Sequence, residues 1–136
     1  LFFDMFKGFL AVLIASYIAK DLVYVAILSV VFGHIFPIYL LFKGGKGVAT
    51  YVGILFSINI LLGIIFVIVW GTIFLIFKFS SLSSIIGSLS IPVYLIVTGQ
   101  TNNAVFFGIM FILIFFTHRE NIKRLKNKEE TKTKIY

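Results

Sequence analysis

The sequence predicts an all-α fold, a polytopic integral membrane helix bundle with about six membrane-embedded helices in a single domain over residues 1–136. Hydrophobic residues make up 60% of the chain and charged residues only 12%, and the mean hydropathy is +1.11. A water-soluble domain of this size needs more polar surface than that. The apolar residues also form long runs with short polar breaks, and a run of about 20 residues is long enough to cross a bilayer.

Two apolar runs are expected to form the first two membrane helices. The first, Leu1–Ala19, is broken only by Asp4 and Lys7 and ends at a charged turn. The second, Leu22–Leu41, contains Pro37 close to its end. Proline has no backbone N–H to donate, so we expect the second helix to bend there.

A polar, glycine-rich break at Phe42–Gly47 precedes a long run without any charged residue. This run is long for one crossing and short for two. Its polar residues Ser57 and Asn59 indicate a division. The two parts are a short helix, Val48–Ile58, and a returning helix, Asn59–Phe77. Small residues at every fourth position let helices approach closely in lipid, and the shorter helix carries Ala49, Gly53 and Ser57.

The second half of the chain is expected to cross the membrane twice more before a basic tail. In order, the predicted segments are a serine-rich turn at Lys78–Ser84, a helix over Ile85–Thr98, a polar turn at Gly99–Asn103, a helix over Ala104–Thr117 and the tail at 118–136. Small residues again recur at every fourth position, at Ser80, Ser84 and Ser88. The first of these two helices is therefore expected to pack against protein at its start.

The basic residues predict the orientation of these helices. Six crossings place eleven of the twelve lysines and arginines on one side of the membrane, and only Lys20 falls on the other. Cytoplasmic segments are rich in lysine and arginine, so the glycine-rich break, the serine-rich turn and the tail are expected in the cytoplasm. The same distribution argues against nucleic-acid binding, because the net charge of +7 lies at helix ends and in the tail.

Composition excludes several kinds of chemistry. The chain has no cysteine, which rules out disulfides and thiol catalysis. Its two histidines and five carboxylates are scattered along the chain, so no metal site is expected. The chain starts at Leu1 without the basic region and cleavage site of a signal peptide, and we expect its natural start to lie further upstream.

The glycine-rich break carries the clearest chemical signal. It contains, directly before a predicted helix, Lys43, Gly44, Gly45, Lys46 and Gly47. Glycines expose backbone N–H groups and lysines add positive charge, so this loop is a candidate phosphate-binding site. A Walker A nucleotide site is disfavoured because Val48 stands where a Ser or Thr would follow the lysine. The alternative interpretation is a flexible interfacial turn whose lysines meet anionic lipid.

Two serines and a histidine near the same predicted membrane face allow two interpretations each. Ser81 and Ser84 could donate hydrogen bonds to a phosphate or orient an alcohol. Taken alone, the favoured interpretation is helix capping, with Ser81 as the natural N-cap for a helix that starts near residue 82. His34 is a candidate site residue, although a lone histidine at a helix end is more often a packing or capping group.

The segment after the last predicted crossing continues as a helix out of the membrane. His118 and Asn121 are three positions apart, so they share one face that could point to an active site. Glu120 and Arg124 are four positions apart in the favourable order, and we expect a solvated ion pair between them. The basic remainder is expected to contact anionic lipid headgroups.

Taken together, these segments resemble the PlsY-type acyltransferases, the bacterial acyl-phosphate:glycerol-3-phosphate acyltransferase family. The matching strings follow the family order over nearly the whole chain and comprise Asp4 with Lys7-Gly8, residues 33–37, residues 43–50, residues 81–84 and residues 118–125. Two positions depart from the pattern. Lys78 replaces the arginine usual before the serines, and Lys128 stands where the family commonly has glycine before a glutamate, here Glu130.

The resemblance implies an activity and a fold. The family moves a fatty acyl group from acyl phosphate to the sn-1 hydroxyl of glycerol 3-phosphate, the first step of phospholipid synthesis. It forms lysophosphatidic acid and phosphate and needs neither a metal nor an organic cofactor. It is a seven-helix enzyme of the bacterial inner membrane, of which this chain would supply the last six helices. The family's first motif, with an active-site serine and arginine, would precede Leu1, so the chain alone is expected to be inactive.

The resemblance also suggests roles for individual residues. Substrate phosphate is expected to bind Lys43, Lys46 and the N–H groups of Gly44, Gly45 and Gly47. Glycerol 3-phosphate is expected to be oriented, and charge at the reacting carbonyl stabilised, by His118, Asn121, Ser81 and Ser84. The base that takes the hydroxyl proton is either His118 or the phosphate of glycerol 3-phosphate itself. Further possible site residues are Lys7, His34 and Glu130.

Two other classes of function stay open at this point. A small transporter would use the serines and glycines only for helix packing, although no charged residue lies between Val48 and Phe77 to form an ion path. A non-catalytic membrane assembly subunit would bind lipid without turnover. No pattern in the sequence predicts an oligomeric state or an acyl-chain preference.

Overall fold

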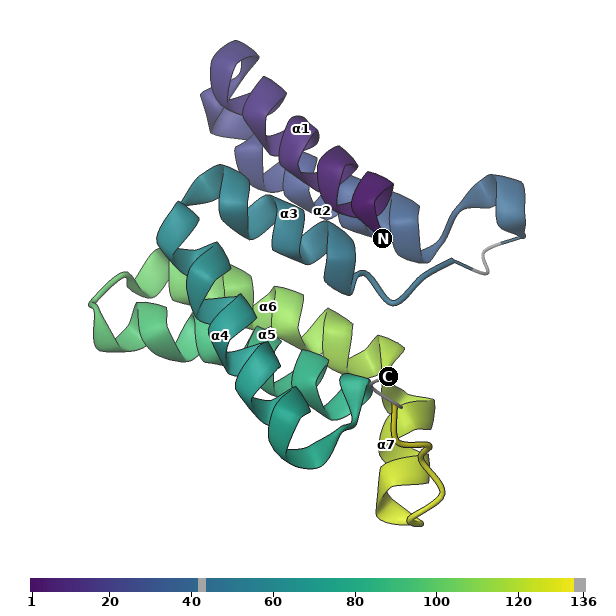
Figure 1. The fold of residues 1–136 in the computed structure, drawn as a ribbon. Coiled ribbons are helices and arrows are strands. Elements are labelled where there is room, and N and C mark those ends of the chain that lie inside the picture. The colour runs from purple at the N-terminus through teal and green to yellow at the C-terminus, as the bar shows by residue number, and fades with distance from the viewer. Residues whose placement is uncertain (42–43, 134–136) are drawn as a thin grey trace. The chain divides into compact units, whose positions relative to one another are not determined.

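The computed structural model describes residues 1–41 and 44–133, and every regular element in those ranges is a helix (Figure 1). This confirms the predicted all-α fold. The chain divides into two compact units, Leu1–Ile64 and Ile65–Tyr136. Within the described residues, two helices are long and apolar enough to cross a membrane, or three if one bent pair is a single span. The predicted number of six spans is therefore not confirmed, and the single domain stays a prediction.

The first unit brings its helices together at small residues. Its elements are α1 Phe2–Ile18, η1 Lys20–Leu22, α2 Val23–Ile35, η2 Ile38–Leu40 and α3 Val48–Ile58, where η marks a short 3-10 helix. Helix α1 lies against α2 and α3 (Figure 1). A Cβ on Gly8 would overlap the Thr50 carbonyl, and a Cβ on Gly53 would overlap the Met5 carbonyl. The close packing predicted for the short helix is thus confirmed at Gly53.

The end of α2 differs from the prediction. The helix stops at Ile35 and does not continue to Leu41, and a separate 3-10 helix follows Pro37. A proline disfavours the helical conformation in the residue before it, and Phe36 has left the helical region, with φ −121° and ψ 58°. Pro37 therefore ends the helix, and the chain leaves α2 toward the glycine-rich loop.

Helices α3 and α4 meet at Asn59, where the sequence predicts a division. Asn59 adopts an extended conformation that ends α3, and α4 covers Ile60–Phe77. The Asn59 Oδ1 accepts a hydrogen bond of 2.9 Å from the Leu61 N–H, which caps the first turn of α4. One asparagine thus serves both helices, and the predicted short helix over Val48–Ile58 is confirmed.

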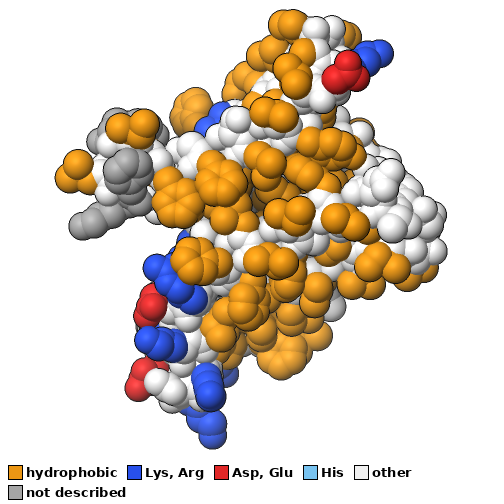
Figure 2. Space-filling model, turned by 180° about the vertical axis from the view of Figure 1, so that it is seen from behind, with side chains coloured by type: hydrophobic (Ala, Val, Ile, Leu, Met, Phe, Trp, Pro, Cys, Tyr) orange, Lys and Arg blue, Asp and Glu red, His pale blue; other side chains and the backbone are white. Residues whose placement is uncertain are grey.

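The second unit contains most of α4 together with α5 (Ser80–Val97), α6 (Thr101–Thr117) and α7 (Arg119–Lys126). Helix α5 packs along α6, and the buried side chains of the two helices include Ile91, Leu95, Phe107 and Met110. Helix α4 meets α5 where the Phe66 ring lies against Gly87. Large apolar side chains stay exposed on α4, among them Val67, Ile68, Leu75 and Ile76, and Figure 2 shows such side chains over much of the visible surface. These exposed apolar faces suit contact with lipid.

The serine-rich segment is helical and is not a turn. Helix α5 begins at Ser80, with Phe79 as its N-cap, so the predicted turn at Lys78–Ser84 and the predicted cap at Ser81 are both wrong. Inside a helix, a serine hydroxyl can donate to the carbonyl four residues earlier. Ser84 does so at 2.9 Å, to Ser80. Ser83 likewise donates to the Phe79 carbonyl, so these two hydroxyls are satisfied within the helix, and the serine-rich segment is part of α5.

Two helices end with the same left-handed turn. Gly99 after α5 and Lys128 after α7 have positive φ values of 77° and 60°. At both turns the next N–H donates to the carbonyl five residues earlier, at 2.8 Å after α5 and 2.7 Å after α7. This is the Schellman motif, in which a left-handed residue reverses the chain at once. Because Gly99 turns so tightly, α6 already begins at Thr101, and the predicted polar turn at Gly99–Asn103 is too long.

The predicted basic tail contains a helix and a returning segment. Helix α7 is bent by 62° from α6 at His118. After the turn at Lys128, the chain returns to the start of α5, where the Thr133 N–H donates to the Lys78 carbonyl at 2.9 Å. The tail thus packs against its own unit through residue 133.

Candidate active site

The site residues predicted from the sequence fall in both units. Lys43 lies outside the described residues. The first unit holds Lys7, His34 and residues 44–47, and the second unit holds Ser81, Ser84, His118, Asn121 and Glu130. In the part of the chain that the structure describes, no three His, Cys, Asp or Glu side chains gather as metal ligands.

Glu130 is the centre of a polar cluster in the second unit. Ser81 Oγ, at the start of α5, and Asn121 Nδ2, on α7, both donate to Glu130 Oε1 at 2.7 Å. Arg124 Nε donates to Oε2, also at 2.7 Å. We name Ser81, Asn121, Arg124 and Glu130 the Glu130 cluster. It joins two predicted catalytic residues that lie 40 positions apart in the sequence to a glutamate whose role the sequence leaves open.

The Glu130 carboxylate is ionised and fixes the orientation of its neighbours. Its side chain is only 10% exposed. Burial raises the pKa of Glu130, but the hydrogen bonds from Asn121, Arg124 and Ser81 outweigh burial and lower the pKa from 4.5 to about 2. An ionised carboxylate only accepts hydrogen bonds. Ser81 therefore directs its proton toward Glu130, and Asn121 directs its NH₂ group there.

Arg124 binds Glu130 and not Glu120 within the described chain, so the predicted ion pair is wrong. The spacing of residues on a helix face shows which side chains are neighbours inside that helix. Here the better partner lies beyond the helix end, where the left-handed turn at Lys128 brings the chain back toward α7.

His118 lies at the bend between α6 and α7 and is 3% exposed. Its Nδ1 is 2.8 Å from the Ile114 carbonyl oxygen. A carbonyl oxygen only accepts, so Nδ1 carries the proton of the neutral ring and Nε2 carries the lone pair that could take a proton. Asn121, one turn further on, is also buried. Both side chains thus face the interior of their unit, as their spacing predicts.

Ser84 contacts a residue that sequence reasoning missed. The Trp70 Nε1 on α4 donates to Ser84 Oγ at 3.2 Å, and Ser84 donates its own proton to the Ser80 carbonyl. The Ser84 hydroxyl thus accepts one hydrogen bond and donates another. A signal was available, because Trp70 is the only tryptophan of the chain and an indole N–H in an apolar helix needs a partner.

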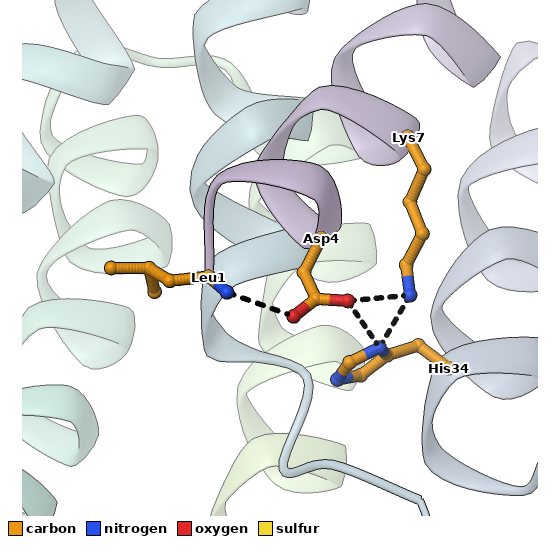
Figure 3. Close-up of polar contacts among 4 residues, drawn as sticks. All are labelled: Leu1, Asp4, Lys7 and His34. Atoms are coloured by element: carbon orange, nitrogen blue, oxygen red, sulfur yellow. Dashed lines mark hydrogen bonds and ion pairs between the residues drawn. The ribbon is translucent and has the colours of Figure 1, made fainter.

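A second polar cluster lies in the first unit, where Asp4 and Lys7 of α1 meet His34 near the end of α2 (Figure 3). The Lys7 Nζ is 2.9 Å from Asp4 Oδ1 and 2.6 Å from His34 Nδ1. Asp4 Oδ1 is 3.4 Å from the same histidine nitrogen. We name these three residues the Lys7 cluster. Two possible site residues from the sequence, Lys7 and His34, are thus in direct contact.

The glycine-rich loop is attached to the end of α2. The Gly44 N–H donates to the Ile35 carbonyl and the Gly45 N–H to the His34 carbonyl, each at 3.2 Å. Two N–H groups that the sequence assigns to phosphate binding are therefore used within the protein in this structure. Lys46, whose side chain is exposed, is the described loop residue best suited to bind phosphate.

The match to a known protein family covers nearly the whole chain. Residues 1–128 match the family model described as Glycerol-3-phosphate acyltransferase. A glycerol-3-phosphate acyltransferase of Pelagibacter ubique (strain HTCC1062) is 62% identical over 136 residues, which are 100% of this chain and 71% of that protein. Another, from Anaplasma marginale (strain Florida), is 42% identical over 134 residues, which are 97% of this chain and 68% of that protein.

Solved structures share the fold. The crystal structure of PlsY, an integral membrane glycerol 3-phosphate acyltransferase, in its glycerol 3-phosphate form matches with a TM-score of 0.91 at 36% identity, over 98% of this chain and 68% of that chain. The lysophosphatidic acid form matches with a TM-score of 0.89 at 37% identity, over 98% and 70%. The resemblance seen in the motifs is confirmed, and a transporter or assembly role is not favoured. This chain is an integral membrane protein and belongs to the glycerol-3-phosphate acyltransferase family.

Proposed function

We propose that this chain moves a fatty acyl group from acyl phosphate to the sn-1 hydroxyl of glycerol 3-phosphate and forms lysophosphatidic acid and phosphate. Membership of the family already makes it an acyltransferase. The acceptor is inferred from a related structure described as the glycerol 3-phosphate form, and the product from one described as the lysophosphatidic acid form. Acyl phosphate as the donor is our own inference.

The observation that carries the proposal is the convergence of Ser81 and Asn121 on one carboxylate at 2.7 Å. The Ser81 hydroxyl donates its hydrogen bond to Glu130. The Ser81 oxygen can therefore accept a hydrogen bond from a substrate hydroxyl. We propose that Ser81, Ser84, His118 and Asn121 orient glycerol 3-phosphate and stabilise the negative charge that develops on the reacting carbonyl oxygen.

The proposed reaction needs no covalent intermediate on the protein. Acyl phosphate is a mixed anhydride, and its carbonyl carbon is already activated. The sn-1 oxygen forms a bond to that carbon, the carbon–oxygen bond to phosphate breaks, and phosphate leaves with the electron pair. The hydroxyl proton passes to His118 Nε2 or to a phosphate oxygen of glycerol 3-phosphate. Positioning and charge stabilisation are then the main contributions of the protein.

The glycine-rich loop supplies positive charge in this proposal. Lys46, together with Lys43, binds the phosphate of a substrate through charge-assisted hydrogen bonds. We further propose the bacterial inner membrane as the location, with this loop and the carboxyl-terminal tail on the cytoplasmic side, because cytoplasmic segments carry most lysines and arginines.

The test is phosphate release by the full-length protein in lipid vesicles supplied with palmitoyl phosphate, with and without glycerol 3-phosphate. We expect release only when the acceptor is present, with an equal amount of lysophosphatidic acid. His118→Ala should lower the rate by roughly 10² to 10⁴ without changing membrane insertion. Glu120→Ala is the matched control, because Glu120 is exposed on the same helical segment, and it should keep the wild-type rate.

The outcomes separate the reaction from the residue roles. A folded protein that releases no phosphate, or that releases it equally without acceptor, would contradict the proposed reaction. A full rate in His118→Ala, with acceptor-dependent release intact, would contradict only the role given to His118.

A further inference from the structure

The imidazole ring of His34 lies directly against Gly45 in the glycine-rich loop. A Cβ on Gly45 would overlap His34 Nε2, and the next nearest atoms, Cε1 at 2.8 Å and Cδ2 at 3.2 Å, belong to the same ring. Gly45 does not have the positive φ that disfavours other residues. The His34 ring is therefore what excludes a side chain at position 45.

Gly44 provides a contrast within the same loop. A Cβ there would overlap the carbonyl oxygen of His34, and it would also meet Pro37 Cδ at 2.5 Å and the carbonyl oxygen of Ile35 at 2.6 Å. The two carbonyl oxygens are backbone atoms at the end of α2, and no side-chain substitution removes them. A side chain at position 44 is excluded by backbone atoms, whereas a side chain at position 45 is excluded by the His34 ring, which a substitution can remove.

Lys7 holds that side chain from α1. Its Nζ is 2.6 Å from His34 Nδ1, and an ammonium group only donates, so Nδ1 accepts and Nε2 carries the proton of the neutral ring. Asp4 Oδ1, 2.9 Å from Nζ, keeps the ammonium group in place. The His34 side chain is only 13% exposed. One edge of the ring is thus fixed by Lys7 while the Nε2 edge faces Gly45.

We propose that Lys7 and His34 are positioning residues for the glycine-rich loop. Lys7 fixes the ring of His34, the ring and the carbonyl of His34 hold Gly45, and Gly45 sets the position of the next residue, Lys46, for substrate phosphate. The inference rests on the proposed function, because it takes Lys46 as a phosphate ligand. In this arrangement two of the three N–H donors of Lys7 serve the protein itself, one toward Asp4 and one toward His34.

The first test is a double-mutant cycle in the full-length enzyme in vesicles, with kcat and KM measured for each substrate. Gly45→Ala should lower kcat/KM by about 100-fold, because its methyl group displaces the loop from the ring. His34→Ala should lower it by about 10-fold, and the double variant should match His34→Ala, because the overlap disappears with the ring.

Two glycine variants are the controls for this cycle. Gly44→Ala should be equally harmful with and without the His34 ring, because its Cβ meets backbone carbonyls. Gly108→Ala should behave like the wild type, because a Cβ there has nothing within 4 Å.

The second test compares two substitutions of Lys7. Lys7→Met keeps a good helix former but cannot donate to His34, and it should raise the KM for a phosphate substrate about 10-fold with little change in kcat. Lys7→Arg is always charged and should restore the wild-type KM. The substrate whose KM rises, acyl phosphate or glycerol 3-phosphate, is the one whose phosphate Lys46 binds.

Each outcome decides one question. Additive losses in the Gly45 cycle, or unchanged KM values for both substrates in Lys7→Met, would overturn the positioning role while the acyltransferase reaction stands. An inactive wild type would overturn the proposed function instead. If His34→Ala does not fold, the comparison of Lys7→Met with Lys7→Arg decides alone.

Discussion

Glu130 organises a polar cluster whose other members come from distant parts of the chain. Ser81 lies in the first turn of α5, whereas Asn121 and Arg124 lie on α7, and all three donate to the same carboxylate. Three donors would lose a charged acceptor if Glu130 were neutral. The protonation state of this one residue therefore controls both the docking of the tail and the orientation of two predicted catalytic side chains.

The low pKa of Glu130 predicts an acid-sensitive fold. The pKa is about 2 in the folded protein and 4.5 ordinarily, so the carboxylate stabilises the fold fully above pH 4.5 and loses this effect as the pH falls toward 2. Glu130→Gln should remove this pH dependence and lower the free energy of unfolding at neutral pH by about 2 kcal/mol. Thermal unfolding in detergent, followed from about pH 6 to about pH 3, measures both effects.

Glu129→Gln is the matched control for this measurement, because Glu129 is the neighbouring carboxylate and is exposed. It should keep the wild-type pH profile. If wild type and Glu130→Gln lose stability in parallel on acidification, other carboxylates govern the acid response.

At the residue scale, the sequence motifs name candidate site residues, but they do not show which side chains contact one another. The motifs already select His118, Asn121 and Ser81. They do not show that Trp70 holds Ser84, because this contact depends on how α4 packs on α5. Helical spacing likewise describes neighbours within one helix and not residues that return from beyond its end.

At the scale of elements, the turns after α5 and α7 have the same backbone conformation but different residues at the left-handed position. Gly99 and Lys128 take the same left-handed conformation, which costs a non-glycine residue roughly 1 kcal/mol. Lys128→Gly should therefore raise the free energy of unfolding by about 1 kcal/mol, and Gly99→Ala should lower it by a similar amount. Unfolding by a denaturing detergent measures both. A loss in Gly99→Ala without a gain in Lys128→Gly would mean that the Glu130 cluster, and not the backbone, fixes the second turn.

Helix bounds were predictable where a polar residue interrupts an apolar run. Asn59 divides α3 from α4 as expected, because its side chain satisfies a free N–H at the helix start. The prediction failed at Pro37, which ends α2, and at Ser80, where the helix begins earlier than expected. The first failure arises because the Pro37 ring disfavours the helical conformation in Phe36. The second arises because a serine can either cap a helix or donate to its carbonyls.

At the scale of the whole molecule, composition and motif order were sufficient for the all-α membrane fold and the family. The number of crossings was not predictable in the same way. A run of apolar residues shows that a segment can enter lipid, but the depth at which a short helix such as α3 ends depends on its neighbours.

The orientation can be tested because residues 1–136 contain no cysteine. Thr131→Cys in the tail should resist a membrane-impermeant maleimide in intact spheroplasts and react after permeabilisation. Lys20→Cys, on the predicted opposite side, should react in both samples, because positive charge is retained in the cytoplasm. Mass spectrometry of the labelled protein measures the extent of reaction. The reverse pattern would place the tail outside and refute the predicted orientation.

The length of α3 links this protein to the thickness of its membrane. Its 11 residues extend about 16 Å, roughly half of a hydrocarbon core of about 30 Å. If Lys46 lies in the headgroup region, the corner at Asn59 would lie near the bilayer centre, and a thicker bilayer would strain this arrangement more than a thin one. An enzyme that feeds acyl chains into phospholipid thus works in a membrane whose thickness its own products help to set. Longer acyl chains would then slow their own incorporation.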